Sequence, residues 1–534
     1  MDKMMDRILI LGAGIMQGPA IRCARNMGLE TVVVDGDPNA PMASLADRFE
    51  PVDLKNTGKI EALARSLMEN GGLSGVMTAG TDFSASVAWV AEKLSLPGIP
   101  YQAALDASDK ERMRRRFKEA GLPSPDHIIL TEAPDESFRL PFDFPAVIKP
   151  VDNMGGRGCR RVDGYGEFRD AAAAALRFSR SGRAIAEEYM DGPEFSVDAV
   201  VFQGEVTICG LADRHIRFPP YFIEMGHTMP TGFPPKDREA LLDVFVKGIR
   251  ALGITNGAAK GDIKLTSKGP MIGEIAARLS GGYMSGWTYP YASGVEPVRG
   301  AIEAALGRRP GGLDPLRNWT SAERAFISIP GKVAGLFGVE EARSLPHIRD
   351  VFVRAVPGGR ISFPENNVSK AGNVISAAPD RETAVEAAGR AAGRILVRLA
   401  APDRETDAFL ESACFPGPAR PVPSGPIFPP PAFVLPAGLL EEFAAIPDIP
   451  GVPGRPKAEA GALYPFPAFT GSGLRDYMER TVEESLAAAE LLTGLRLRVD
   501  RDGAALGRGF WAALIRGGYQ GAAYYIDRLR QPGD

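Results

Sequence analysis

The sequence predicts an α/β fold at the N-terminus, a larger α+β region after it, and a mostly helical segment at the C-terminus. Residues 6–120 alternate apolar, strand-like runs with helix-like runs, which is the pattern of a parallel, doubly wound sheet. After Gly121 the chain mixes short strands, hairpin turns and helices, which favours an α+β arrangement. Proline becomes dense between residues 414 and 436, where an extended spacer is expected.

The length of 534 residues indicates about two to four domains. From the breaks above we expect five segments: a doubly wound domain over 1–120, an α+β domain of two subdomains over 121–310, a continuation of the same body over 311–400, a proline-rich linker over 401–436, and a helical appendage of unassigned role over 437–534.

Composition and charge exclude several classes of protein. The net charge of −4 gives no global basic field, so no nucleic-acid partner is expected. The four cysteines form no C-x-x-C pair, which argues against a zinc site and a disulfide framework. No signal peptide is recognisable, and no run approaches the roughly 20 apolar residues of a membrane span. The sequence therefore predicts a soluble, cytoplasmic protein with no membrane partner.

The first domain is predicted element by element. "RILILGAG" reads as a buried strand, "GPAIRCARNMGL" as a helix, "ETVVVDGDP" and "GLSGVMTAGTD" as two further strands, and "FSASVAWVAEKL" as a helix. Ligands of such sheets lie beyond the carboxyl ends of the strands. Those ends carry Gly12–Gly14, Asp35–Asp37 and Gly80–Asp82.

The first strand-to-helix turn is an incomplete dinucleotide fingerprint. The pattern G-x-G-x-x-G is met at Gly12 and Gly14, but Gln17 stands where the third glycine belongs. Asp35 could still hold a ribose hydroxyl. An NAD-linked oxidoreductase therefore stays open as an alternative that the broken fingerprint opposes.

A glycine-rich loop follows the apolar run "FPAVIKP". In "VDNMGGRGCR" three glycines, Gly155, Gly156 and Gly158, surround Arg157, just downstream of Lys149. Such a loop is either a structural turn or a flap whose bare backbone N–H groups approach phosphate oxygens. Taken alone, the loop does not decide between the two.

A hairpin with paired acids is the second informative stretch. "KGDIKL" and "MIGEIAA" flank a Ser-Lys-Gly turn. If the turn centres on Lys268, Asp262 faces Glu274 across the ladder, where like charges repel. A divalent cation would offset this repulsion, and two carboxylates suit Mg²⁺. Arg278 lies four residues beyond Glu274, on the same face if the strand continues.

A third stretch, "AIAEEYMDGPEFSVDAVV", joins two apolar runs through an acidic turn near residues 187–194. It could be a hinge between two sheets, with backbone groups for an adenine edge and a carboxylate for a ribose. On its own it is no better than an acidic surface turn.

Together, and in this order, the stretches from residue 6 to about 400 resemble the ATP-grasp superfamily, in its carboxylate–amine ligase branch. The resemblance implies a Rossmann-like domain that precedes the ATP-grasp domain. It implies these roles by position: Lys110 and Lys149 contact the nucleotide phosphates; Met154, Gly155, Gly156, Arg157 and Gly158 form the flap over them; Glu187, Glu188 and Met190 lie at the adenine hinge; Glu194 binds the ribose; Asp262 and Glu274 bind Mg²⁺ or Mn²⁺; and Arg278 lies at the transferred phosphoryl group.

The sequence departs from the family pattern at the metal motif. The first metal acid is the shorter Asp262 in place of a glutamate, and Ala276 stands where the E-x-N-x-R motif has its asparagine. One metal contact is therefore missing or replaced. Cys159 beside the flap is also unexpected, and its simplest interpretation is a small buried residue.

The activity implied by the resemblance is that of an ATP-dependent ligase. ATP converts a small carboxylate to an acyl phosphate, and an amine displaces phosphate. The segment 212–233 lies between hinge and hairpin and holds the candidate substrate residues Arg214, His215, Glu224 and His227, unless it is a polar lid without direct contact. The alternative from another class is a catalytically silent nucleotide-binding scaffold, which Ala276 favours.

The last hundred residues fall outside the resemblance. Trp511, Tyr519, Tyr524 and Tyr525 lie among apolar residues there, too many to leave solvated without a partner surface. We expect residues 437–534 to be a separately packed helical appendage that caps the ligase body, forms a homodimer or docks a partner.

Overall fold

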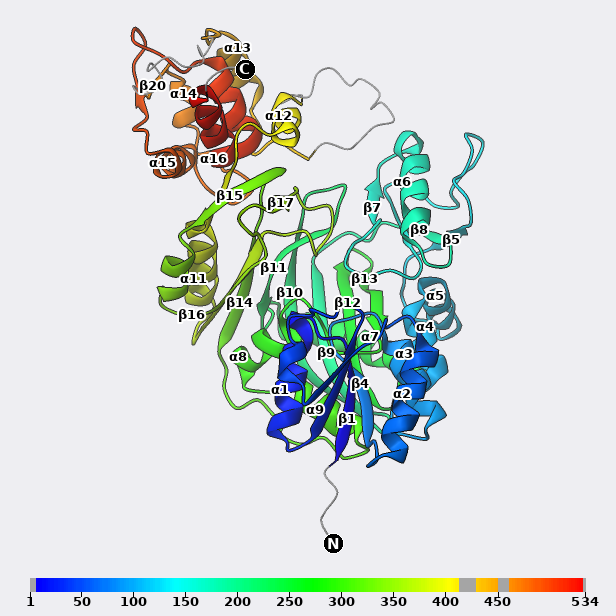
Figure 1. Ribbon diagram of the computed structural model, residues 1–534. Helices are drawn as coiled ribbons and strands as arrows, with labels where there is room; N and C mark the ends of the chain where they lie inside the picture. The colour runs from blue at the N-terminus through cyan, green and yellow to red at the C-terminus, as the bar shows by residue number, and fades with distance from the viewer. Residues whose placement is uncertain (1–5, 413–428, 450–460, 532–534) are drawn as a thin grey trace. The chain divides into compact units, whose positions relative to one another are not determined.

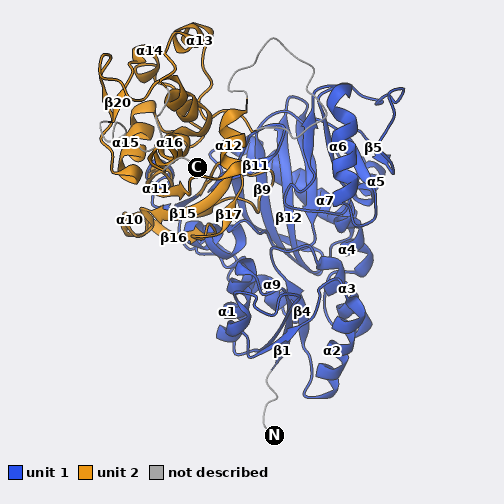
Figure 2. Cartoon of the chain, turned by 45° about the horizontal axis from the view of Figure 1, so that its top comes forward, with its two compact units in different colours: residues 1–323, 376–385 blue, residues 324–375, 386–534 orange. Residues whose placement is uncertain are grey.

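The computed structural model describes residues 6–412, 429–449 and 461–531. By their internal contacts these residues form two compact units, coloured separately in Figure 2. Unit 1 comprises residues 1–323 and 376–385, and unit 2 comprises residues 324–375 and 386–534. A compact unit can hold more than one domain, so the five expected segments remain a prediction.

The N-terminal sheet of unit 1 is parallel, as predicted, in the order β3-β2-β1-β4. Its strands β1 and β4 are labelled in Figure 1. Side chains alternate between its faces, so Ile8 and Ile10 pack on one side while Leu9 and Leu11 pack on the other. Helices α1 and α9 cover the first face, and α2 and α3 cover the second. The short strand β3 was not predicted. The bounds are β1 Arg7–Leu11, α1 Gly18–Asn26, β2 Glu30–Asp35, β3 Arg48–Pro51, α2 Thr57–Glu69, β4 Gly75–Thr78, α3 Ser84–Lys93 and α9 Pro297–Ala305.

A second, smaller sheet has the order β5-β8-β6-β7 and carries the glycine-rich loop between β6 and β7. Helix α6 packs its alanine-rich face against this sheet, through Ala171, Ala172 and Ala175. Helices α4 and α5 precede the sheet in the chain. The bounds are α4 Tyr101–Ser108, α5 Lys110–Glu119, β5 His127–Leu130, β6 Ala146–Pro150, β7 Arg160–Val162, α6 Tyr165–Phe178 and β8 Ala184–Glu188.

The large sheet has the order β13-β12-β9-β10-β11-β14-β18-β16, and its first five strands, which lie in unit 1, pair antiparallel. Helix α7 packs on β12 and β13, where Phe245 meets Ile272 and Ile275 in one apolar cluster. Because β8 belongs to the small sheet and β9 to the large one, the segment between them connects the two sheets, and its role as a hinge stays a prediction. The bounds are β9 Glu194–Phe202, β10 Glu205–Arg217, β11 Ile223–Met229, α7 Pro235–Leu252, β12 Gly257–Thr266, β13 Gly269–Ala276, η3 Met284–Thr288, α8 Tyr289–Ser293 and β14 Thr320–Phe326.

Unit 2 is built on a three-stranded sheet of order β17-β15-β19. The boundary between the units falls inside β14, β18 and α11. The bounds are β15 Gly331–Phe337, α10 Val339–Ser344, β16 Ile348–Val353, β17 Arg360–Ile361, β18 Gly372–Ala378, α11 Arg381–Arg394, β19 Leu396–Leu399, α12 Arg404–Glu411, α13 Ala437–Ala444, β20 Ala462–Leu463, α14 Pro467–Thr470, α15 Val482–Thr493, β21 Arg498–Val499 and α16 Arg508–Arg530.

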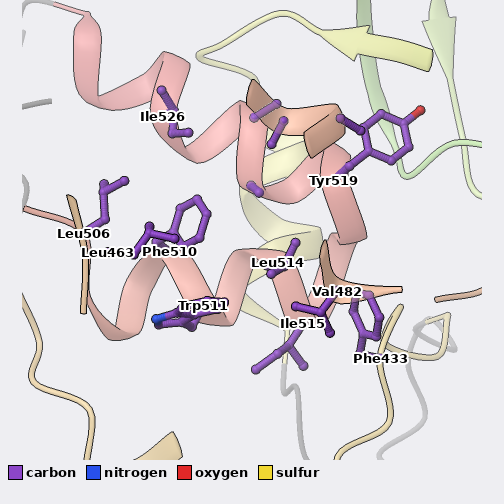
Figure 3. Packing of buried hydrophobic residues seen from close by; sticks show 14 of the residues in the cluster. Phe433, Leu463, Val482, Leu506, Phe510, Trp511, Leu514, Ile515, Tyr519 and Ile526 are labelled. Atoms are coloured by element: carbon purple, nitrogen blue, oxygen red, sulfur yellow. The ribbon is translucent and has the colours of Figure 1, made fainter. Parts of the chain in front are cut away.

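The described part of the C-terminal segment is helical, as predicted, but it is not separately packed. Its core surrounds α16, which bends at Gly518 (φ 60°, ψ −149°) and buries Trp511 and Leu514 (Figure 3). Tyr519 accepts a hydrogen bond from the Val397 N–H (2.9 Å), which ties α16 to β19 within unit 2. The expected linker over 401–436 contains α12, and its residues 413–428 lie outside the described part of the chain.

No helix in the described ranges combines the length and apolar character needed to cross a lipid bilayer.

Candidate active site

Lys110 is the first residue of α5, directly after Asp109, whose carboxylate accepts the N–H groups of the first helical turn. The lysine is buried. Its Nζ donates to the Asn153 carbonyl (2.8 Å) at the base of the glycine loop and lies 3.6 Å from Glu274 Oε2. Burial alone would lower the pKa of Lys110, but the facing carboxylates of Glu274 and Asp82 raise it above its ordinary value. The ammonium therefore stays charged between the loop and the hairpin.

Lys149, on β6, pairs with Glu187 on β8 (Nζ to Oε2, 2.7 Å). The other carboxylate oxygen of Glu187 accepts from Arg114 Nε at 2.8 Å. Burial favours protonation of Glu187, but Arg114 and Lys149 outweigh it and lower its pKa to about 2. The Glu187 side chain thus anchors two cations, so an adenine at this hinge would meet the strand backbone and not this carboxylate.

The remaining hinge residues lie where the small sheet gives way to the large one. Glu188, the last residue of β8, pairs with Lys268 of the hairpin turn (2.5 Å). Met190 follows in the connecting segment and is partly buried. Glu194 opens β9 and forms an ion pair with Arg214.

The loop 154–158 requires its glycines. Gly155, Gly156 and Gly158 all have positive φ angles, of 69°, 77° and 68°. A Cβ at Gly158 would also lie 2.9 Å from the Phe178 side chain. Arg157 donates to the Met154 carbonyl at 3.2 Å and so folds back over the loop.

The β12–β13 hairpin brings its two acids together as predicted, with Asp262 directly opposite Glu274. The turn is one residue tighter than expected, because Thr266 pairs with Gly269. The tighter turn shifts the pairing by one residue, and a bulge at Gly273 shifts it back by one residue. Asp262 and Glu274 therefore face each other as expected. Burial would raise the pKa of Glu274, but the surrounding cations, led by Lys110 and Lys260, lower it to about 2.

Asp262 is already held by cations. Arg214 Nη1 lies 2.7 Å from its Oδ1, and the Lys260 ammonium forms an ion pair with its Oδ2. Arg214 also pairs with Glu224 (2.7 Å). The largely buried guanidinium of Arg214 therefore contacts three acids: Glu194, predicted to bind the ribose; Asp262, predicted to bind the metal; and Glu224, predicted to bind the substrate.

Arg278 follows β13 and is buried, and its guanidinium donates to the Leu279 carbonyl at 2.9 Å. Leu279 bridges in parallel to Ala79, just beyond β4 of the N-terminal sheet. Asp82 follows Ala79 by three residues. Burial raises the pKa of Asp82 above its ordinary value, although the positive charges of Arg278 and Lys110 act to lower it. Asp82 is a candidate site residue that sequence analysis did not assign, although it marked Gly80–Asp82 as a strand end.

The substrate candidates separate into two groups. Glu224 and His227 lie on one face of β11, because a bulge opposite His215 and Ile216 puts an extra residue between them. His227 Nδ1 lies 3.5 Å from Glu224 and 3.3 Å from Glu323 of β14, while its Nε2 is 2.9 Å from the Thr288 hydroxyl. Glu323 was not predicted.

Glu224, His227 and Glu323 have the composition of a small metal site, with ligand atoms within 4.8 Å of one another. Burial would lower the pKa of His227, but the two carboxylates raise it above 6.5. In the arrangement that the structure shows, the imidazole of His227 lies between two carboxylates as an ion-paired cluster. His215 lies apart from it and contacts Thr228 (3.0 Å).

The N-terminal turn does not offer its donors to a dinucleotide. The Gly14 N–H donates to Gln17 Oε1 (2.9 Å), and the Ala13 N–H donates to Asp35 Oδ2 (2.7 Å). Gln17 is itself buried, so the residue that breaks the fingerprint fills the turn. This geometry opposes the oxidoreductase alternative.

Comparison with known protein families identifies residues 142–286 as an ATP-grasp domain. The chain thus contains an ATP-grasp domain. Residues 325–400 match a second model, the L-amino acid ligase C-terminal domain 2.

Curated proteins similar to this chain are about one quarter identical to it. An uncharacterised protein, y4rH of Sinorhizobium fredii (strain NBRC 101917 / NGR234), is 25% identical over 392 residues, which cover 72% of this chain and 81% of that protein. Carnosine synthase 1 of Gallus gallus is 26% identical over 400 residues, which cover 68% of this chain but only 43% of the synthase. The match thus covers well under half of the carnosine synthase.

Solved structures support the fold. An L-amino acid ligase from Bacillus licheniformis superposes with a TM-score of 0.67 at 21% identity, over 74% of this chain and all of that one. Phosphoribosylglycinamide synthetase from Anaerococcus prevotii gives a TM-score of 0.58, also at 21% identity, over 74% of this chain and all of that one. The C-terminal helices α12 to α16 begin after residue 400, so they lie outside the segment 325–400 that matches the L-amino acid ligase C-terminal domain 2.

Proposed function

We propose that this ATP-grasp chain is a ligase that activates a small carboxylate as an acyl phosphate and joins it to an amine, releasing ADP and phosphate. The observation that carries the proposal is the position of the Lys110 ammonium. It donates to the Asn153 carbonyl at the base of the glycine loop and lies 3.6 Å from the Glu274 carboxylate. One cation thus connects the loop that would cover the phosphates with the acid that would hold a metal.

The reaction would proceed in two displacements. A carboxylate oxygen of the substrate attacks the γ-phosphorus, the bond from phosphorus to the bridging oxygen of ADP breaks, and ADP leaves. The amine nitrogen then attacks the acyl carbon, the bond from that carbon to the phosphate oxygen breaks, and the nitrogen loses a proton. Lys110, Lys149 and Arg278 would stabilise the charge that shifts among the phosphoryl oxygens.

The loop 154–158 would close over the β- and γ-phosphates, with its backbone N–H groups facing them. Glu194 would bind the ribose, and the hinge at 188–190 would receive the adenine. Mg²⁺ or Mn²⁺, when bound, would neutralise phosphate charge, held by Glu274 and phosphate oxygens. Asp262 fits such an ion less well, because both of its oxygens pair with side-chain cations.

Amino acids are the substrates that this site favours. Glu224 and Asp82 are acids that would receive a substrate ammonium in exchange for their present partners Arg214 and Arg180, and Arg278 is a cation for the substrate carboxylate. The matched L-amino acid ligase domain and the similarity to a carnosine synthase support this class. His215, on the other side of β10, is assigned no contact with substrate.

A screen of ADP release tests the proposal. Purified protein is given Mg²⁺-ATP with single amino acids and with pairs, and condensation products are sought by mass spectrometry. We expect ADP release that depends on a carboxylate–amine pair, with one amide product per ADP. Binding of an ATP analogue without turnover on any pair would instead favour the silent scaffold, for which Ala276 is the supporting observation.

We further propose that the protein works in the cytoplasm and that it forms a homodimer. Cys23, Cys159 and Cys209 are free thiols, as expected in the reducing cytoplasm. A homodimer would be detected by light scattering of the purified protein.

A further inference from the structure

Lys260 lies directly opposite Ala276, the position at which the metal motif has lost its asparagine. The two residues form a cross-strand pair in the β12–β13 ladder, next to the pair of Asp262 and Glu274. Because residues two apart on a strand share a face, the Lys260 side chain projects on the same side as Asp262. Ala276 presents only a methyl group to Lys260 across the ladder.

The Lys260 ammonium has two acids nearby, Asp198 and Asp262, and it pairs with Asp262. On the other side of β12, Lys260 is opposite Asp198, a fully buried acid. Asp198 is occupied by Ser280, which donates to it from both its N–H (3.1 Å) and its hydroxyl (2.5 Å). The Lys260 Nζ forms its ion pair with Asp262 Oδ2.

This ion pair is not a surface pair. The side chains of Lys260 and Asp262 are 13% and 19% exposed, against 55% and 58% for the pair of Lys247 and Asp243 on helix α7. With Arg214 on its other oxygen, Asp262 has two cationic partners fixed by the backbone register. The negative charge of Asp262 is thus already balanced by two cations, although its Oδ1 accepts no hydrogen bond from the described residues. Glu274 is the better metal acid of the hairpin, because its ion pair with Lys110 is longer, at 3.6 Å.

We propose that Lys260 replaces part of the metal charge at the phosphoryl-transfer site, so that the protein loads one divalent ion per ATP and not two. This inference rests on the proposed function, because it concerns the same ATP site. A lysine ammonium is a compact point charge that needs no bound ion, and it supplies the positive charge that the altered motif no longer recruits as a metal. Ala276 and Lys260 act together, since an asparagine at 276 would add a ligand oxygen and crowd the lysine.

The test counts metal ions at the ATP site of the full chain. Mn²⁺ is titrated into protein saturated with a non-hydrolysable ATP analogue, and bound Mn²⁺ is measured by electron paramagnetic resonance. The wild type is expected to bind one Mn²⁺ per nucleotide. The double variant Lys260→Ala/Ala276→Asn is expected to bind two, while Lys260→Arg, which keeps the charge, and Lys247→Ala, a matched surface control, stay at one.

Two Mn²⁺ ions per nucleotide in the wild type would overturn the inference while leaving the proposed function intact. One ion in a folded double variant would also overturn it, because Lys260 and Ala276 would then not set the number. If the double variant does not fold, the wild-type count still decides. Failure of the wild type to bind the ATP analogue at all would overturn the proposed function, and this inference with it.

Discussion

Glu187 and Glu274 are buried carboxylates that stay ionised because lysines and arginines surround them. Both have pKa values of about 2, against an ordinary 4.5, although burial pushes in the opposite direction. A lowered pKa stabilises the fold fully above pH 4.5, and this contribution is lost as the pH falls toward 2. The charges of the candidate site therefore also hold the site together.

Replacement of one such acid should abolish turnover without unfolding the protein. We expect Glu274→Gln to lower ADP release at least about a hundredfold, because it removes the charge that faces Lys110 and would hold the metal. Asp262→Asn should have a similar effect, because it releases both Lys260 and Arg214. The measurement is the steady-state rate of ADP release.

Glu205→Gln is the matched control for that measurement, because Glu205 is 62% exposed and pairs with Arg309 at the surface. Its rate should remain within about twofold of the wild type. A near-normal, Mg²⁺-dependent rate in Glu274→Gln would refute the role of this hairpin.

His227 should give the protein a stability that fades at alkaline pH. Its pKa is raised above 6.5 because Glu224 and Glu323 outweigh burial, so the imidazolium stabilises the fold fully below pH 6.5. That contribution is lost as the pH rises through the raised pKa. We expect His227→Gln to destabilise the fold by about 3–5 kcal/mol below pH 6.5, since it removes the cation that lies between Glu224 and Glu323, and by less at higher pH.

Urea unfolding of the wild type and His227→Gln between pH 5.5 and 9 measures this difference. His347→Gln is the control, since His347 is exposed. A difference between wild type and His227→Gln that does not change with pH would show that His227 acts through shape and not through charge.

At the scale of elements, hairpins and bulges decide what the site contains. The β12–β13 hairpin places Asp262 opposite Glu274 only because the bulge at Gly273 compensates for the tight turn. The bulge in β11 likewise turns His227 to the face of Glu224. A single extra residue moves side chains to the other face of a strand, so each bulge selects the residues that converge.

The glycine loop is the element expected to respond to nucleotide. Three glycines with positive φ lower its local stability, and phosphates would order it through its backbone N–H groups. We expect amide exchange at residues 154–158 to slow on addition of an ATP analogue. Hydrogen-exchange mass spectrometry of the free and bound protein measures this change.

Gly311 and Gly312 provide the control, because they form another Gly-Gly pair, in an exposed segment to which no role is assigned. Their exchange should be the same with and without nucleotide. Equal exchange at 154–158 in both states would argue that this loop is a structural turn.

At the scale of the whole molecule, each unit has its own core. In unit 1, Phe117 lies in the cluster under the large sheet, and in unit 2, Trp511 lies in the core around α16 (Figure 3). Both side chains are fully buried. The C-terminal helices share unit 2 with β15 and β19, so their removal would expose the core of that unit and not simply detach an appendage.

Substitutions in the two cores should distinguish the unfolding of unit 1 from the unfolding of unit 2. Phe117→Ala and Trp511→Ala should each destabilise their unit by about 3–5 kcal/mol. Because only unit 1 holds the proposed ATP site, an ATP analogue should raise the unfolding temperature of the transition that Phe117→Ala lowers, and not that of the transition that Trp511→Ala lowers. Calorimetry with and without the analogue measures both transitions.

Nucleotide affinity, measured by titration calorimetry, completes this experiment. Trp511→Ala should bind the analogue as the wild type does. A collapse of affinity in folded Trp511→Ala protein would mean that unit 2 contributes to the ATP site.

The sequence by itself determined the features that depend on local chemistry. Strand and helix periodicity predicted the parallel N-terminal sheet, and the Ser-Lys-Gly turn predicted the β12–β13 hairpin, although the facing of Asp262 and Glu274 also required the bulge at Gly273. The glycines of 154–158 predicted a glycine-rich loop, and all three adopt positive φ angles. These features follow from side-chain period and from the conformational freedom of glycine, which act over a few residues.

Only the tertiary structure decided which charges meet. Arg114 and Glu187 are 73 residues apart, and Arg180 and Asp82 are 98 apart, so no spacing rule could pair them. The partners of Asp262 and the approach of Glu323 to His227 likewise depend on strand order and on bulges. Burial strengthens the attraction within these ion pairs and raises the free-energy cost of a charge without a partner. The folded arrangement, and not the residue types alone, therefore determines the electrostatics of the site.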